Sequence, residues 1–125
     1  MLLNEIKYVS ERYCLTQDRI NKFAKASGGY GKIHVDPEHA KNTIFKVTLA
    51  HGFHLVAMIE KELNSLYPSR KDGMLEVKFV KPIKVNEEFI ICCEPDEHEN
   101  LLKVTILNEL NEVAVVGTAS KYHFA

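Results

Sequence analysis

The sequence predicts an α+β protein in which an antiparallel sheet wraps around one long central helix. Residues 51–66 carry apolar side chains at helical spacing. Four later segments are typical of strands, at residues 74–80, 89–93, 101–107 and 113–122. With an extended segment near the start of the chain, this makes about five strands. Because the strands follow the helices and are joined by short turns, an antiparallel sheet is favoured over βαβ units.

The first third of the chain is expected to hold an extended segment and two helices. Residues 6–13 are predicted to be extended. Thr16 is a suitable N-cap for a helix that includes Phe23 and ends at Gly28-Gly29. Asp36-Pro37 predicts a second helix start, with aspartate as N-cap and proline as the first helical residue.

The central helix has an unusually broad apolar face. Leu55, Ile59 and Leu63 recur at helical spacing, and Ala57 and Met58 widen the stripe. A helix of this kind is expected to be largely buried. Further along the chain, residues 99–100 and 109–112 are expected to connect neighbouring strands. Pro82 argues against an uninterrupted central strand at its position.

Composition indicates one domain, residues 1–125, without a strongly charged partner. The chain has 125 residues, with 16 Lys+Arg against 17 Asp+Glu and a formal charge of −1. This balance does not favour electrostatic binding to nucleic acid or to an anionic membrane. No apolar run reaches the length of about 18 residues that a transmembrane helix needs, and the N-terminus does not resemble a signal peptide.

The cysteine pattern favours a reducing compartment, so a cytoplasmic protein is expected. Cys14, Cys92 and Cys93 form no CxxC pair, and an odd number makes a poor disulfide framework. On a strand, Cys92 and Cys93 would point to opposite faces, one buried and one more exposed.

Residues 23–55 hold the most informative pattern. His34 lies in a glycine-rich loop, and Ala50-His51-Gly52 opens the central helix. The segment resembles the motif of MaoC-like domains of the (R)-specific enoyl-CoA hydratase group, which have the hotdog fold. The matching positions are Phe23-Ala24, Ser27-Gly28, Ile33-His34, Asp36, Ala40, Phe45, Ala50-His51-Gly52 and the later segment 77–83.

The resemblance implies a site centred on His34 and the main-chain amide of Gly52. In that family an aspartate and a histidine five positions apart bind the reacting water. His34 matches the histidine, but Gly29 stands where the aspartate is expected, and Gly31-Lys32 replaces the usual Asn-Pro. Tyr30, Gly31 and His51 are predicted to contact the substrate. Coenzyme A is expected as part of the substrate, with no metal and no separate cofactor.

The chemistry explains why these residue types matter. Hydration of a 2-enoyl thioester places water on C3 and a proton on C2, and enolate charge develops on the thioester oxygen. Amides at a helix start can stabilise that oxygen, and glycine leaves its own amide accessible. Histidine can give or take a proton near neutral pH, whereas glycine cannot. The altered position 29 therefore puts the standard mechanism in question.

Three groups could replace the missing carboxylate. Tyr30 could hydrogen-bond a ligand or simply pack, and Asp36 could orient His34 or simply cap the helix at Pro37. A carboxylate could also come from another subunit.

Other polar residues allow alternative interpretations. His51 and His54 could join His34 in a metal site, but a structural bond from His51 to the backbone is favoured. The lysines at 78, 81 and 84 could bind the phosphates of coenzyme A, or they could simply lie on a solvent-exposed edge. The remaining histidines are expected at the surface, namely His39, His98 and His123.

The expected function is therefore hydration of 2-enoyl-CoA, or dehydration of 3-hydroxyacyl-CoA, at an atypical site. One alternative is a catalytically weak acyl-CoA-binding subunit that needs an active partner subunit in a hetero-oligomer. Another alternative is a hotdog thioesterase. The resemblance implies a homodimer or a higher oligomer.

Overall fold

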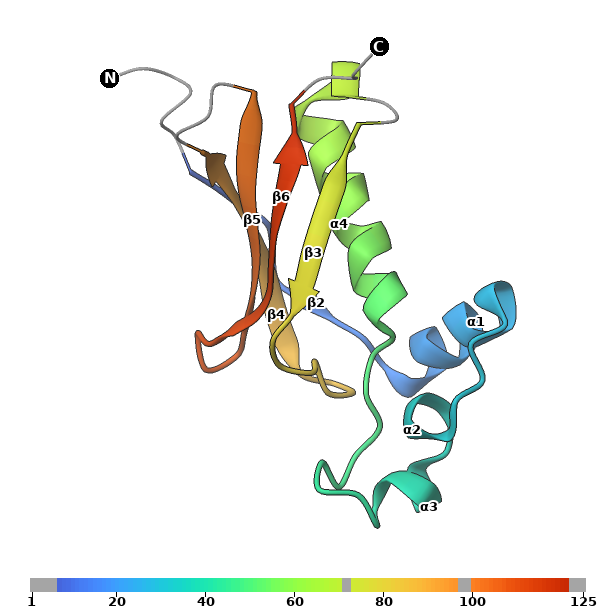
Figure 1. Cartoon of the computed structure of the whole chain (residues 1–125). Coiled ribbons are helices and arrows are strands. Elements are labelled where there is room, and N and C mark those ends of the chain that lie inside the picture. Colours follow the sequence, from blue (N-terminus) through green and yellow to red (C-terminus); the bar gives the residue numbers. More distant parts are fainter. Residues whose placement is uncertain (1–6, 71–72, 97–99, 122–125) are drawn as a thin grey trace.

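The long helix α4 runs along one face of a six-stranded antiparallel sheet, and the shorter helices lie beyond its first turn (Figure 1). The structure is a computed structural model that describes residues 7–70, 73–96 and 100–121. The elements in chain order are β1 (Tyr8–Val9), β2 (Tyr13–Cys14), α1 (Gln17–Ser27), α2 (Lys32–Val35), α3 (Pro37–Ala40), α4 (Gly52–Leu66), η2 (Pro68–Arg70), β3 (Leu75–Phe79), β4 (Glu88–Pro95), β5 (Leu101–Asn108) and β6 (Val113–Ser120). The strand order is β1-β4-β5-β6-β3, and β2 also pairs with β4.

The alternating pattern of the strands produces one apolar sheet face. The register places Leu102 opposite Ala119 and Ile106 opposite Val115, and all four side chains are buried. Lys103, one position along β5, points to the other face and is exposed. The predicted α+β architecture with an antiparallel sheet is confirmed, with two two-residue strands among its six.

Helix α4 is less buried than its composition predicts. Leu55, Ile59 and Leu63 lie in the core, four residues apart, so they share one stripe. Phe53 is 81% exposed and Ala57 is also exposed. The expectation of a largely buried helix is therefore wrong, because a single sheet covers only one side of a helix.

The local signals for helix ends are confirmed. Thr16 caps α1 by accepting a hydrogen bond from the amide of Arg19. Gly28 ends α1 in the left-handed conformation at φ 79°, which glycine adopts without steric cost. Asp36 accepts from the amide of His39 at the start of α3, with Pro37 as its first residue.

The predicted difference between the two neighbouring cysteines is wrong. Cys92 and Cys93 are 2% and 4% exposed, although they point to opposite sheet faces. Cys93 faces the core, whereas Cys92 lies on the outer face of β4, opposite Val9 on one side and Thr105 on the other. A small thiol on a strand with neighbours on both sides is covered by them.

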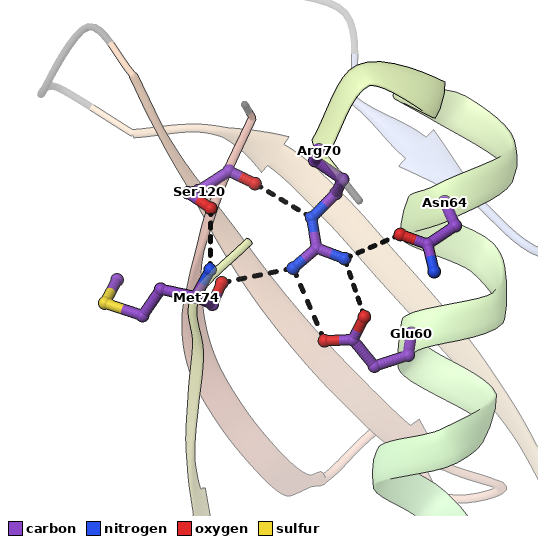
Figure 2. A network of polar contacts seen from close by, with 5 residues as sticks. All are labelled: Glu60, Asn64, Arg70, Met74 and Ser120. Atoms are coloured by element: carbon purple, nitrogen blue, oxygen red, sulfur yellow. Dashed lines mark hydrogen bonds and ion pairs between the residues drawn. The ribbon is translucent and has the colours of Figure 1, made fainter. Parts of the chain in front are cut away.

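A buried arginine connects the far end of α4 to the sheet (Figure 2). Arg70 has no exposed surface, and its Nη1 lies 2.7 Å from Glu60 Oε2 and 2.9 Å from Asn64 Oδ1 on α4. Its other donors bond the main-chain oxygens of Ser120 on β6 and Met74 beside β3. This network ties helix and sheet together at the end of α4 opposite to Gly52.

Two further outcomes concern the termini and the surface. His98, His123 and the predicted strand end at Tyr122 lie outside the described residues, whereas His39 is exposed as predicted. None of the described helices is long and apolar enough to cross a membrane.

Candidate active site

The ring of His34 is held by a main-chain oxygen. Its Nδ1 lies 2.8 Å from the carbonyl oxygen of Leu49, which precedes α4. A carbonyl can only accept, so Nδ1 is assigned the hydrogen and Nε2 holds the lone pair. His34 thus presents Nε2 as an available base. The segment is also held through its backbone, because the amide of Leu49 bonds the oxygen of Ile33 at 3.0 Å.

Gln17 positions the backbone of His34, a role that the sequence did not reveal. Gln17 Nε2 donates to the main-chain oxygen of His34 at 2.8 Å and to Asn21 Oδ1 at 2.9 Å. Its Oε1 accepts from Thr48 Oγ1 at 2.5 Å. The first turn of α1 therefore connects α2, which contains His34, to the segment before α4. The prediction that His34 lies in a loop is thus wrong. A glutamine in a first helical turn carries no sequence signal for such a role.

His51 is a buried N-cap residue that stacks on His34. The ring centroids are 4.0 Å apart with an interplanar angle of 21°. His51 Nε2 donates to the oxygen of Gly29 at 2.7 Å, so the predicted bond from His51 to the backbone is confirmed. Its Nδ1 is buried and has no hydrogen-bond partner among the described residues. Burial lowers the pKa of His51; the bond to Gly29 opposes this shift and the charge of His34 adds to it.

A second aromatic pair lies beside these histidines. Phe23 stacks on His54 with centroids 4.4 Å apart and planes at 4°, and it also contacts His51 at 5.0 Å. Burial lowers the pKa of His54, and the positive charge of Arg19 lowers it further. The neutral imidazole is therefore favoured at His51 and at His54.

The start of α4 lies beside an apolar cavity of about 400 Å³. The N–H of Gly52 has no acceptor among the described residues, and His51 supplies no side-chain cap. The lining residues are Ala50, Gly52, Leu55, Phe79, Val80, Lys81, Pro82 and Ile83. His34 is not one of them. The structure thus brings His34 next to His51, the neighbour of Gly52, but the cavity that touches Gly52 does not touch His34.

The position that lacks the carboxylate faces the histidine pair. A Cβ added at Gly29 would lie 3.1 Å from Cδ2 and 3.2 Å from Nε2 of His51. No described aspartate or glutamate hydrogen-bonds to His34 or His51. Asp36 does not substitute, because its carboxylate caps α3 as the simpler interpretation predicts.

The other predicted residues occupy different environments. Tyr30 is 60% exposed, and a Cβ at Gly31 would lie 3.5 Å from the ring of His34. Lys78, Lys81 and Lys84 are exposed, but Lys81 Nζ pairs with Glu112 Oε2 at 2.6 Å. Phe79 contacts Gly52 and lines the cavity, although the sequence indicated only that it belongs to a strand.

Comparison with known proteins identifies the family of this chain. The family model described as "MaoC like domain" matches residues 5–113. The 3-hydroxyacyl-thioester dehydratase Z of Mycobacterium tuberculosis (strain ATCC 25618 / H37Rv) is 34% identical over 82 residues, which cover 61% of this chain and 54% of that protein. The chain therefore spans about half the length of the curated relatives it matches.

Solved structures identify the fold. The (R)-hydratase from A. caviae involved in PHA biosynthesis superposes with a TM-score of 0.83 at 22% identity, covering 94% of both chains. An R-hydratase from Pseudomonas aeruginosa gives a TM-score of 0.81 at 21% identity, covering 94% of this chain and 79% of that one. At these identities the likeness shows the fold alone, and it confirms the predicted hotdog architecture.

Proposed function

Because this chain belongs to the MaoC-like dehydratase family, we propose that it hydrates 2-enoyl thioesters or dehydrates 3-hydroxyacyl thioesters. Coenzyme A is the proposed carrier, as part of the substrate rather than as a cofactor. The observation that supports the proposal is the free Nε2 of His34, whose ring is held by the bond from Nδ1 to Leu49 and stacks on His51, the residue before the unpaired amide of Gly52.

One histidine can perform both proton transfers. His34 Nε2 takes a proton from water while the water oxygen bonds C3 and the double-bond electrons move toward the thioester oxygen. The N–H of Gly52 stabilises that negative oxygen. The protonated His34 then returns a proton to C2 as the thioester carbonyl forms again. Such positioned acid/base contacts typically contribute about 10²–10⁴ in rate.

The remaining predicted residues are proposed to shape this site. Gly31 lies beside the His34 ring and leaves room for the substrate. Tyr30, which is 60% exposed, is proposed to contact the carrier part of the thioester. His51 is proposed to contact the substrate as predicted and also supports His34 by stacking on its ring.

A second candidate function follows from the missing carboxylate. No described carboxylate contacts His34 or His51, so a proton carrier that the family normally provides is absent from the described residues. The chain would then be an acyl-CoA-binding subunit whose active partner supplies the chemistry. This candidate predicts affinity for acyl-CoA without turnover.

A homodimer or higher oligomer is proposed because apolar side chains and a strand edge are left open. Phe53 is 81% exposed, and Val80 is 51% exposed after the end of β3. Among the described strands, β3 pairs only with β6, so its other edge can accept a second copy. A cytoplasmic location is proposed because Cys14, Cys92 and Cys93 are all free thiols.

Hydration of crotonyl-CoA by purified protein tests the proposal. Loss of enoyl absorbance, with a mass gain of one water and an intact thioester, is expected for the parent protein. His34→Ala is expected to lower the rate by at least about 100-fold. A fast parent enzyme unaffected by His34→Ala would show that the chemistry lies elsewhere, and release of free thiol would instead identify a thioesterase.

Substitution at Gly29 separates the two candidates. Gly29→Asp places a carboxylate beside the His51–His34 stack and is expected to raise the rate several-fold, because a negative charge favours protonated histidine. Gly29→Asn is the matched control, with similar volume but no charge. If Gly29→Asp is folded and no faster than Gly29→Asn while acyl-CoA still binds, the binding-subunit candidate is favoured.

A further inference from the structure

Phe79 occupies an unusual position for an apolar residue on the inner sheet face. It ends β3 opposite Val115, which is buried, and it lies on the same face as Leu75 and Val77. Those two residues pack against the core, whereas Phe79 remains 51% exposed. The last residue of β3 therefore projects its ring beyond the core.

The ring of Phe79 lies directly on the backbone of Gly52. A Cβ added at Gly52 would lie 2.9 Å from Cζ and 3.1 Å from Cε1 of Phe79. Real Cβ atoms essentially never make contacts as short as 2.9 Å. The space beside the Gly52 Cα is thus already filled to van der Waals contact. A side chain at position 52 would have to displace this ring, so the ring and the glycine backbone fit together.

The same ring forms the partly exposed wall of the apolar cavity. Ile83 and Leu55 are 0% and 3% exposed, so their walls are fixed by core packing. Lys81 is tied to Glu112 and leaves the lining mainly apolar. A cavity of about 400 Å³ with this lining suits the acyl part of a ligand.

We propose that Phe79 selects acyl groups that are unbranched at C2. This inference rests on the proposed function, because it assumes that the thioester carbonyl binds at the Gly52 amide. C2 is bonded to that carbonyl carbon, so it lies beside the ring of Phe79. A straight acyl group fits beside the ring, whereas a methyl branch at C2 clashes with the ring. Misfit of one methyl group typically changes discrimination by about 10-fold or more.

Binding of two isomeric ligands tests the inference without any turnover. Butyryl-CoA and isobutyryl-CoA have the same composition and differ only by the branch at C2, and neither has a double bond to hydrate. Calorimetric titration of the parent protein is expected to show at least about 10-fold tighter binding of butyryl-CoA. In Phe79→Ala this preference is expected to fall to about 2-fold or less.

The matched control is Phe53→Ala. Phe53 is also an exposed aromatic residue and follows Gly52 directly, but it does not line the cavity. It is expected to keep the parent preference. Phe79→Leu keeps an apolar but smaller side chain in the cavity wall, so an intermediate preference for butyryl-CoA is expected. This variant tests the inference if Phe79→Ala folds poorly.

The possible outcomes separate this inference from the proposed function. An unchanged preference in folded Phe79→Ala and Phe79→Leu, or a parent protein that binds both isomers equally, overturns the role of Phe79. A parent protein that binds neither isomer overturns it as well. If butyryl-CoA binds with the expected preference but crotonyl-CoA is not hydrated by any variant, the hydratase function fails and the role of Phe79 stands.

Discussion

Replacing Arg70 by methionine is expected to lower the free energy of unfolding by about 3 kcal/mol. The guanidinium of Arg70 has no exposed surface, and its donors bond Glu60, Asn64 and two main-chain oxygens (Figure 2). Methionine has a similar unbranched stem but supplies no donor. Removal of one partner from a buried ion pair typically costs about 3–5 kcal/mol.

The partial exposure of Glu60 places the expected value at the lower end of that range. Its side chain is 34% exposed, so water can solvate the carboxylate once Arg70 is gone. The oxygens of Ser120 and Met74 would still lose their donor. For a chain of this size, a loss of about 3 kcal/mol corresponds to a fall in Tm of roughly 10 °C.

Chemical unfolding with a matched control measures this effect. Arg12→Met makes the same substitution at a side chain that is 74% exposed and lies 4.0 Å from Glu88, so a loss of about 0–1 kcal/mol is expected. Protein concentration must be equal in all samples, because assembly contributes to stability. A double variant, Arg70→Met with Glu60→Leu, is expected to recover part of the loss, since neither charge then remains.

Equal, small losses in Arg70→Met and Arg12→Met would refute this reasoning. They would show that the buried guanidinium contributes no more than a surface ion pair. Turnover per folded molecule is expected to be unchanged in Arg70→Met, because Arg70 lies in η2, which follows the end of α4 opposite to Gly52.

Three further predictions concern pH, packing and assembly. Burial lowers the pKa of His51, so the unfolded chain binds more protons, and stability is expected to fall as pH drops below about 6.5 toward the pKa of the folded state. Urea unfolding of the parent and His51→Gln checks this; a parent stability that is independent of pH would contradict it. Gly117→Ala is expected to cost about 1–3 kcal/mol, because its Cβ would lie 2.5 Å from the oxygen of Glu76 on the paired strand. Gly31→Ala, whose Cβ meets nothing closer than 3.5 Å, is the control for thermal unfolding. Sedimentation at micromolar concentration is expected to give a mass above that of a monomer, reduced in Phe53→Asp; a monomer at all concentrations would argue against assembly.

The positions of most secondary structure elements, though not of α2 and η2, could be predicted because their signals are local. Thr16, Gly28 and Asp36 act within one turn of their own backbone, so each helix end was visible from neighbouring residues. Apolar periodicity likewise located α4, and alternation located the strands. The motif around His34 and Gly52 indicated the family, because its order and spacing survive the loss of the expected carboxylate.

Burial and side-chain contacts were decided by tertiary structure, because they depend on residues far apart in the chain. Cys92 is covered by Val9 through strand pairing, and one side of α4 stays open because a single sheet covers the other. Arg70 is buried because α4, β3 and β6 meet around it. The sequence by itself determined where most helices and strands form and that His34 belongs to the segment before the central helix. The prediction that His34 lies in a loop is wrong, because residues 32–35 form the short helix α2. Only the tertiary structure decided three contacts of the site: His34 stacks on His51, the carbonyl of Gly29 accepts a hydrogen bond from His51, and Phe79 packs on Gly52. Each contact joins segments that are distant in the chain, and local propensity cannot bring such segments together.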